Sequence, residues 1–385
     1  MERARDADAC PGALQTHHAA DGELARIRLP GGMITARQME AVALAATEFG
    51  SSALELTSRG NLQIRGLRDT ASVAELLVDA GLLPSRTHER VRNIVASPLS
   101  GRSGGLCDVR GLVAALDSAV QREPQLSQLP GRFLFGLDDG RGDISGLDPD
   151  AGIHALDEST FALLLAGRDT GVRLNVTDVV AVLLATAVRF TDLRGNCWRI
   201  AELDDPLAIL GPLTPTVPTP TTLTPTASAG RTWPAPTRPP VGWIEQTDGR
   251  VTLGAAPRLG VLDSESALYL AALGAPMAIT PWRSVLLFDL EEGTADAALR
   301  VLAPRSLVFD QNSGWLSLSA CTGSPGCEHS AADVRADAAA AVDDAVSLSG
   351  VHRHFVGCER ACGSPTHGKV MVATGDGYQP RKSHP

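Results

Sequence analysis

The chain has 385 residues, of which 44% are hydrophobic, and its mean hydropathy is +0.03. This composition is typical of a folded globular protein, and the length exceeds the usual size of one hydrophobic core, so we expect two or more domains. The formal net charge of -10 at pH 7 argues against general nucleic-acid binding, although local basic clusters can still hold an anionic ligand.

The N-terminal stretch "MERARDADACPGALQTHH" contains no apolar segment of signal-peptide length. Nowhere do about 18 uncharged apolar residues follow one another, so no membrane partner is expected. We therefore expect a cytoplasmic protein. In a reducing compartment, clustered cysteines are more often metal ligands or redox groups than structural disulfides.

Residues 21–67 read as a turn, an apolar strand, a helix and further strand. Thr35 followed by Gln38 fits a capping box and predicts a helix over 35–48. After this helix the sequence alternates with strand periodicity, and Ser58 and Gly60 are expected to mark a bend or bulge. The apolar positions are Leu54, Leu56, Leu62 and Ile64, and the polar positions are Glu55, Thr57, Arg59, Asn61, Gln63 and Arg65.

Residues 131–147, "GRFLFGLDDGRGDISGL", read as a strand, an Asp/Gly turn and a second strand. Asp138, Asp139 and Asp143 lack the spacing and the terminal glutamate of a calcium loop, so hairpin turn chemistry is favoured for them.

Residues 211–240 hold nine prolines and nine threonines and read as a linker. Such a segment is either a semi-rigid solvated spacer or a disordered bridge without function. After it, residues 248–290 repeat the order of elements in 21–67, with Thr57 and Arg59 aligned with Thr280 and Arg283. We interpret this as an internal duplication; the alternative is coincidence between two common strand-helix-strand segments.

Four cysteines near the C-terminus form two pairs, Cys321 and Cys327 with five intervening residues, and Cys358 and Cys362 with three. Four thiolates on two glycine-rich loops can surround a [4Fe-4S] cluster. A structural zinc site is the alternative, but zinc loops favour C-x2-C pairs. The remaining cysteines, Cys10, Cys107 and Cys197, are isolated and read as core or surface thiols.

With these pieces in place, the sequence resembles the sulfite and nitrite reductase superfamily over nearly its whole length. The resemblance is carried by the two cysteine pairs, by "LTSRGNLQIRGL", by "RNIVASP" and by the duplicated unit. It implies an α+β fold of duplicated sulfite/nitrite reductase-like architecture, with paired ferredoxin-like half-domains and α/β cluster-binding domains. It also implies that the four cysteines hold a [4Fe-4S] cluster, with Cys362 reaching towards a tetrapyrrole.

The resemblance divides the chain into five parts. We expect a first ferredoxin-like half-domain at 1–87, a reductase-like α/β domain at 88–210, the linker at 211–240, a second half-domain at 241–302, and the iron-sulfur domain at 303–385.

Within the superfamily, the sequence is similar to the precorrin-3B synthase branch. The chain is shorter than assimilatory reductases, and its opening "CPGALQTHHAADGELARIRLPGG" looks like this branch. Where reductases place two anion-binding lysines after "LP", this chain has "LPGRFLF", in which Arg132 can replace one lysine but Leu134 cannot replace the other. Each lost cation weakens the binding of a small anion, so six-electron anion reduction is disfavoured.

The branch implies a monooxygenase that hydroxylates and lactonises precorrin-3A with O2 and electrons from a donor such as NADH or a ferredoxin/reductase. Because a fully thiolate-ligated cluster does not readily oxygenate carbon, a mononuclear non-haem iron is a further expectation. The candidates near the cysteines are His329, His352, His354 and His367, and His367 is the candidate for a catalytic role.

Arginines suit a substrate that carries many carboxylates around an apolar macrocycle. The expected substrate-binding residues are Arg59, Asn61, Gln63, Arg65, Arg92 and Arg132. The alternative is a solvated sheet face whose arginines pair with local acids. Two rival functions stay open: a siroheme-dependent sulfite or nitrite reductase, and a non-catalytic iron-sulfur redox protein.

Overall fold

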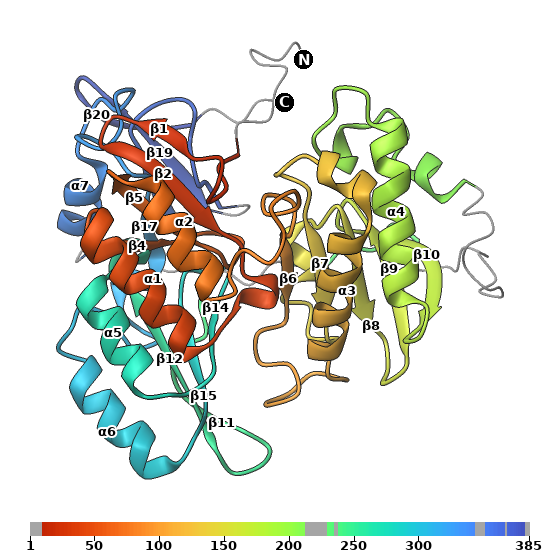
Figure 1. Cartoon of the computed structure of the whole chain (residues 1–385), viewed down its shortest axis with the longest axis horizontal. Coiled ribbons are helices and arrows are strands. Elements are labelled where there is room, and N and C mark those ends of the chain that lie inside the picture. The colour runs from red at the N-terminus through yellow and green to blue at the C-terminus, as the bar shows by residue number, and fades with distance from the viewer. Residues whose placement is uncertain (1–9, 212–228, 235–237, 343–350, 366–367, 382–385) are drawn as a thin grey trace. The chain divides into compact units, whose positions relative to one another are not determined.

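The computed structural model describes residues 10–211, 229–234, 238–342, 351–365 and 368–381. The chain forms two compact units (Figure 1). Unit 1 contains residues 84–236 with 1–12 and 28–32, and unit 2 contains 13–27, 33–83 and 237–385. The expected division into five parts stays a prediction.

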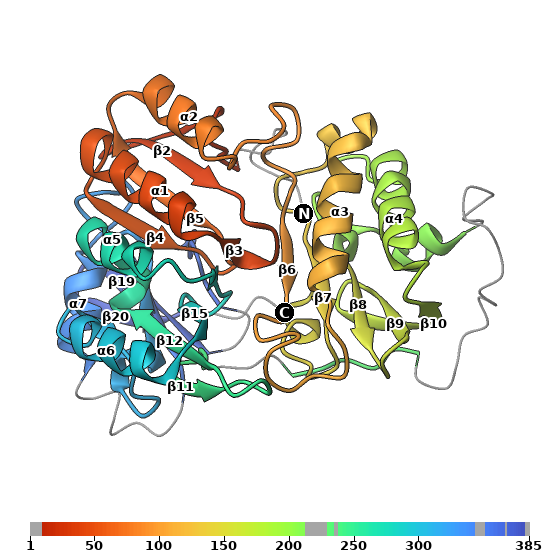
Figure 2. The ribbon, with the colours of Figure 1, turned by 60° about the horizontal axis from the view of Figure 1, so that its bottom comes forward.

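Unit 1 contains a five-stranded sheet of order β10-β9-β8-β7-β6, in which β6, β7 and β8 are parallel and β8, β9 and β10 are antiparallel. Helices α3 (Arg110–Arg122) and α4 (Val179–Leu193) lie side by side over this sheet, and their apolar faces form one core with it (Figures 1 and 2). The strands are β6 (Ile94–Ala96), β7 (Phe135–Asp138), β8 (Ala151–Ala155), β9 (Thr160–Leu165) and β10 (Arg168–Asn175). Short 3-10 helices connect them: η2 (Pro124–Gln128), η3 (Ser145–Leu147), η4 (Ile200–Glu202) and η5 (Pro206–Leu210).

The hairpin predicted for residues 131–147 is wrong. β7 and β8 run parallel, with Phe135 paired to Ala151, and η3 occupies the place of the expected second strand. The cause lies in the Asp138 carboxylate, which accepts four backbone N–H groups, and four such bonds wrap the chain into a compact loop instead of a tight turn. The donors are Gly140, Gly142, Ile144 and Ser145, at 2.8–2.9 Å.

Unit 2 contains two similar half-domains. The helices of the first are α1 (Ala36–Phe49) and α2 (Thr70–Asp79), and those of the second are α5 (Ser264–Ala272) and α6 (Glu292–Leu302). The first has strands β1 (His17–Ala19), β2 (Gly22–Ile27), β3 (Met33–Ile34), β4 (Ala53–Leu56) and β5 (Leu62–Leu67). The second has strands β11 (Gly242–Glu245), β12 (Val251–Pro257), β13 (Val261–Asp263), β14 (Met277–Ile279) and β15 (Val285–Leu290), and β16 (Leu307–Val308) pairs with β12.

The half-domains exchange one strand each. β13 pairs with β4 in the sheet of the first half-domain, and β3 pairs with β14 in the sheet of the second. In each half-domain the exchanged strand leads directly into a helix, and these helices, α1 and α5, pack against each other (Figure 2). This reciprocal arrangement supports the predicted internal duplication.

Two matching turns show the register of the duplication. In the first, Thr57 N–H donates to Asn61 O and Gly60 N–H donates to Thr57 O. In the second, Thr280 N–H donates to Ser284 O and Arg283 N–H donates to Thr280 O. Thr57 therefore corresponds to Thr280 as expected, but Arg283 corresponds to Gly60 and not to Arg59, which corrects the predicted alignment by one residue.

The helix predicted over 35–48 is present in the structure. Thr35 and Gln38 form the expected capping box, and the helix runs over Ala36–Phe49. The expected bend at Ser58 and Gly60 is a full turn between the antiparallel strands β4 and β5, so Arg59 lies on a turn and not on a strand face.

The last part of unit 2 is a four-stranded sheet of order β17-β18-β19-β20, in which β17, β18 and β19 are parallel. Helix α7 (Val334–Ala340) packs on it and contributes Val334 and Ala338 to a small core with Leu318 and Phe355. The strands are β17 (Leu318–Ala320), β18 (Arg353–Val356), β19 (Lys369–Thr374) and β20 (Gly377–Pro380), and η7 (Gly314–Ser317) precedes β17. η1 (Pro30–Gly32) and η6 (Arg258–Gly260) precede the two exchanged strands.

The predicted linker stays a prediction, and its described residues 229–234 are mostly exposed but make contacts with other residues. Gly230 N–H donates to Asp169 O and Asp169 N–H donates to Arg231 O, at 2.7 and 2.9 Å. The centroid of the Trp233 ring lies 4.2 Å from that of the His154 ring, so this stretch contacts the β8 strand of the same unit.

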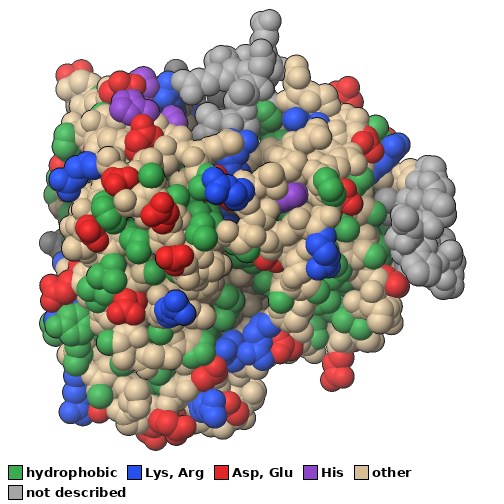
Figure 3. Space-filling view, viewed as in Figure 1, with side chains coloured by type: hydrophobic (Ala, Val, Ile, Leu, Met, Phe, Trp, Pro, Cys, Tyr) green, Lys and Arg blue, Asp and Glu red, His purple; other side chains and the backbone are tan. Residues whose placement is uncertain are grey.

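No helix in the described part of the chain is long and apolar enough to cross a membrane. On the face drawn in Figure 3, acidic and basic side chains are interspersed among scattered apolar ones.

Candidate metal centre

The four cysteines of the sequence motif lie on two loops that leave the same edge of a sheet. Cys321 directly follows β17, and Cys358 lies two residues after the end of β18. Because β17 and β18 are parallel neighbours, their carboxyl ends meet at one edge, and the loops meet there as well. Cys321 N–H donates to Phe355 O and Ala331 N–H donates to Gly357 O, both at 2.9 Å, which ties the two loops together.

The thiols are close enough to influence one another electrostatically. Burial, and then the charges of Cys321, Cys358 and Cys327, raises the pKa of Cys362. Four thiolates in this position repel one another unless a cationic metal group lies between them. One backbone donor already points at a sulfur, since Gly357 N–H lies 3.4 Å from Cys321 Sγ, as N–H donors do around iron-sulfur clusters.

The spacing of the sulfur atoms bears on the kind of metal. A tetrahedral zinc site with Zn–S bonds of about 2.3 Å needs sulfur atoms roughly 3.8 Å apart. Among the described residues, one group of three Cys, His, Asp or Glu ligand atoms lies within 4.8 Å, and it contains no cysteine. By this measure, no three of the four sulfurs form a preformed tetrahedral zinc site.

Two glycines beside the cysteines do not tolerate a side chain, one for lack of space and one because of its backbone conformation. A Cβ at Gly357 would collide with the side chain of Ser330, and Gly363 has φ 75°, which favours glycine. The backbone of the second cysteine loop therefore depends on glycine at both positions.

A chain of hydrogen bonds through three polar side chains supports the second cysteine loop. Ser319 Oγ lies 2.7 Å from His352 Nε2 and 2.8 Å from His354 Nδ1, and His354 Nε2 lies 2.9 Å from Cys362 O. Burial, followed for His352 by the Arg283 charge, lowers the pKa of both histidines to about 4. Neutral His354 must then donate from Nε2 to the Cys362 carbonyl, so Ser319 donates to His354 and accepts from His352.

The histidines proposed for an iron site do not form one among the described residues. His352 and His354 bond to Ser319, and His329 forms an exposed pair with Glu328. His367, the candidate for a catalytic role, lies outside the described residues.

The predicted substrate-binding residues of unit 2 engage partners inside the protein. Arg65 forms two 2.8 Å bonds with Asp21 and one 2.9 Å bond with Gly326 O. Gln63 accepts from Arg26 and donates to Glu55, which in turn pairs with Arg335. Arg59 is half-buried on the β4–β5 turn, and Asn61 is buried at 1% exposure.

The two predicted residues of unit 1 are also engaged. Arg92 forms a two-pronged ion pair with Asp117 at 2.7 and 2.8 Å, and its side chain is 7% exposed. The Arg132 guanidinium lies over the Trp198 ring at 4.8 Å, while Leu134 is buried. Arg65 and Arg92 therefore each pair with a carboxylate of the protein, as the alternative to substrate binding expected. Substrate binding by the six residues stays a prediction.

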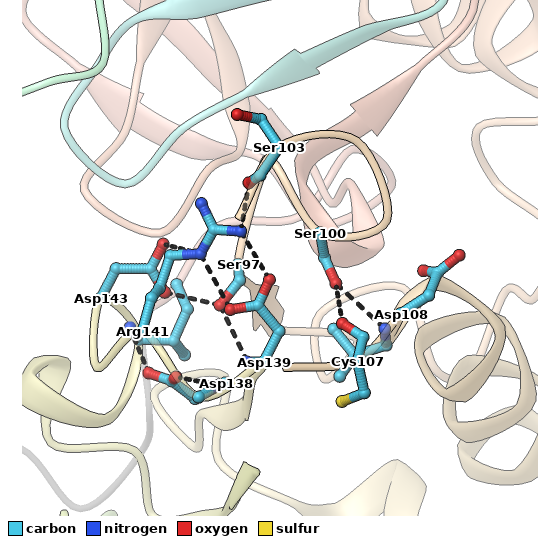
Figure 4. A network of polar contacts seen from close by, with 12 residues as sticks. Ser97, Ser100, Ser103, Cys107, Asp108, Asp138, Asp139, Arg141 and Asp143 are labelled. Carbon is cyan, nitrogen blue, oxygen red and sulfur yellow. Dashed lines mark hydrogen bonds and ion pairs between the residues drawn. The ribbon is translucent and has the colours of Figure 1, made fainter. Parts of the chain in front are cut away.

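The structure brings together three carboxylates that the sequence placed in a turn. Asp138, Asp139 and Asp143 converge around Arg141 and Ser97 (Figure 4). Asp139 pairs with Arg141 at 2.8 Å, and Ser97 Oγ donates to Asp143 at 2.5 Å. Burial, and then the Asp138 charge, raises the pKa of Asp143 to about 7. Burial opposes ionisation of Asp138, but hydrogen bonds from His154 and from backbone N–H groups outweigh it and hold that pKa at about 2.

Sequence reasoning missed two residues that support the cysteine loops, Ser319 through His354 and Arg283 directly. Ser319 directly precedes the last residue of β17, a position that gives no signal of its own. Arg283 donates to Gly363 O at 2.9 Å. The repeat could have indicated Arg283, because this residue lies three positions after Thr280. The predicted alignment instead placed Arg283 opposite Arg59.

Comparison with known proteins gives matches to two kinds of enzyme. Residues 17–77 match the nitrite/sulfite reductase ferredoxin-like half domain. The chain is 26% identical over 388 residues to a precorrin-3B synthase of Sinorhizobium sp, covering 96% of this chain and 81% of that protein. It is 34% identical over 162 residues to the ferredoxin--nitrite reductase of Synechococcus elongatus, covering 40% of this chain and only 30% of that protein.

Among solved structures, the NirA protein of Mycobacterium tuberculosis is similar, with a TM-score of 0.73 at 19% identity, covering 93% of this chain and 74% of that one. The predicted mixed α+β fold and the resemblance stated from the sequence are confirmed by these matches.

Proposed function

We propose that this chain, which resembles precorrin-3B synthase within the nitrite and sulfite reductase superfamily, is an oxidoreductase that oxygenates a tetrapyrrole. One observation carries the proposal. Four cysteines lie on two loops at the carboxyl ends of parallel strands, in a chain that is similar to a precorrin-3B synthase along 96% of its length.

Cys321, Cys327, Cys358 and Cys362 would hold a [4Fe-4S] cluster, which supplies one-electron transfer when bound. The loop contacts described above orient the thiolates. The neutral pair His352 and His354 fixes the direction of the Cys362 carbonyl, and Gly357 supplies an N–H donor to sulfur.

The proposed substrate is precorrin-3A, and the proposed partners are O2 and an electron donor such as NADH or a ferredoxin/reductase. In this reaction one oxygen atom enters the ring as a hydroxyl group, and a peripheral carboxylate closes a lactone. The other oxygen atom leaves as water after taking up two electrons from the donor and two protons. A mononuclear non-haem iron for O2 activation belongs to the proposal too.

A siroheme-dependent reductase is the second candidate, favoured by the nitrite reductase match over 162 residues. The stretch that replaces the two anion-binding lysines speaks against it. Leu134 is buried at 4% exposure, and Arg132 lies over Trp198. Such a stretch offers a small anion little charge stabilisation.

The test uses full-length protein reconstituted anaerobically with iron and sulfide. The protein is mixed with precorrin-3A, oxygen and a reductant are admitted, and the product is examined by mass spectrometry. We expect a product that has gained one oxygen atom, and none with Cys358→Ser. Intense siroheme bands in the purified protein together with sulfite or nitrite reduction would favour the second candidate. If the cluster is intact but precorrin-3A stays unchanged, the result would favour a non-catalytic iron-sulfur redox protein.

A further inference from the structure

Two arginines reach the backbone directly beside the cluster cysteines. Arg65 Nη2 donates to Gly326 O at 2.9 Å, and Gly326 precedes Cys327. Arg283 Nη2 donates to Gly363 O, also at 2.9 Å, and Gly363 follows Cys362. Arg65 comes from β5 of the first half-domain and Arg283 from the β14–β15 turn of the second. Each half-domain thus contacts one cysteine loop through one arginine.

Arg65 is held in place before any metal binds. Its guanidinium makes two parallel 2.8 Å bonds to Asp21, and its side chain is 10% exposed. A Cβ at Gly326 would lie 3.1 Å from Asp21 Oδ2, so the cysteine loop approaches this ion pair closely. A fixed, charged donor makes a stronger hydrogen bond to a carbonyl than a mobile one.

Arg283 occupies a backbone position that does not suit an arginine. Its φ is 60°, and its counterpart in the first half-domain, Gly60, has φ 64°. A residue with a Cβ is strained in this left-handed region, whereas glycine is not. Because Gly60 makes the same turn with the same backbone bonds, the turn itself does not require arginine. The side chain must account for it, and the partner that the side chain reaches is Gly363 O.

A second glycine, Gly260, lies directly against the Arg283 side chain. A Cβ at Gly260 would lie 2.6 Å from Cδ of Arg283, so the Arg283 side chain passes through space that only glycine leaves open. Gly260 has φ 74°, as does Gly32, which lies in the corresponding place before β3.

We propose that Arg65 and Arg283 are positioning residues that clamp the two cysteine loops at the separation a [4Fe-4S] cluster needs. Arg283 also sets a positive charge beside the cluster, whereas the charge of Arg65 is balanced by Asp21. This inference rests on the cluster in the proposed function and not on its substrate. Each guanidinium binds the negative end of a backbone carbonyl that adjoins a cluster cysteine. A nearby cation also favours the reduced, more negative state.

The decisive variant is Arg283→Gly, because glycine fits the turn better than arginine does. The metal-free variant should melt at the wild-type temperature or above it, since the left-handed strain is removed. The reconstituted variant should nevertheless release iron to a chelator about tenfold faster under anaerobic conditions, since a charge-assisted hydrogen bond is lost. Its reduction potential should shift to a more negative value.

Arg65→Lys tests the other loop, because a lysine cannot bond to both Asp21 oxygens and Gly326 O in the same fork. We expect faster iron release here too, and faster release in the double variant than in either single one. Arg305→Ala is the matched control, since Arg305 pairs with Glu265 and lies over Tyr269 in the same unit. It should leave the potential and the release rate unchanged.

The outcomes separate the two proposals. Wild-type protein that assembles no iron-sulfur cluster overturns the proposed function. A wild-type cluster that Arg283→Gly and Arg65→Lys retain within twofold, at an unchanged potential, overturns the arginine clamps alone.

Discussion

Arg92 shows how one contact changes the interpretation of a residue. Its ion pair with Asp117 is almost fully enclosed, with side-chain exposures of 7% and 15%. Gln121 donates a further 2.8 Å bond to the same carboxylate. Removing one partner of a buried pair leaves an uncompensated charge, whereas removing both does not.

Arg92→Ala should therefore lower the free energy of unfolding of unit 1 by about 3 kcal/mol, measured by urea unfolding. The double variant with Asp117→Ala should be less destabilised than the single one. Arg110→Ala, at a pair with 42% and 45% exposed side chains, is the control and should change little. A stable Arg92→Ala protein that has lost tetrapyrrole binding would instead return Arg92 to the substrate site.

Asp143 gives a prediction about pH. Its pKa in the folded protein is about 7, above the ordinary 3.8, so between these values the folded state binds a proton that the unfolded state has released. Asp143 therefore reduces the stability of unit 1 as the pH rises from about 4 to about 7. Asp143→Asn keeps an acceptor for Ser97 and removes the charge, so it should raise the melting temperature at pH 8 and have little effect at pH 4. An equal shift at both pH values would contradict the prediction.

At the scale of elements, the exchanged strands make the half-domains depend on each other. β13 belongs to the second half-domain in sequence but forms the edge of the first sheet, with Leu262 paired to Leu54. Leu262 is 1% exposed, so its side chain lies in the core of a sheet whose other strands come from far earlier in the chain.

Leu262→Ala should cost about 2–5 kcal/mol, as buried leucine truncations do. Hydrogen exchange should show faster exchange in β4 and β5 as well as in β13, because the truncated strand supports that sheet. Val301→Ala, at a 48% exposed position on α6, is the control. Faster exchange confined to the second half-domain would show that the exchanged strand does not couple the two.

For the whole molecule, the division into two units separates the cysteines from the acidic cluster. All four cysteines lie in unit 2, and Asp138, Asp139 and Asp143 lie in unit 1, which has a large core of its own. A ligand that binds only the folded form of one unit stabilises that unit by mass action.

Calorimetry of the full-length protein should therefore show two transitions, and reconstitution with iron and sulfide should raise only one of them. Arg92→Ala identifies the other, because it lowers the transition of unit 1. The expectation fails if both transitions rise together on reconstitution, or if the transition that Arg92→Ala lowers is the one that rises.

Local features of the sequence determined a large part of this protein. The capping box at Thr35, the repeat of Thr57 at Thr280 and the two cysteine pairs each depend on residues close together in the chain, so spacing alone exposes them. The α+β class was implied by the family resemblance that these motifs carry.

The tertiary structure decided which partner each polar group finds. Arg65 meets Asp21 and Gly326, and Arg92 meets Asp117. The strand exchange and the role of Arg283 belong to the same class. Such contacts join residues far apart in the chain, and a charge pattern along the sequence does not distinguish an arginine that faces a ligand from one that is neutralised by a distant carboxylate.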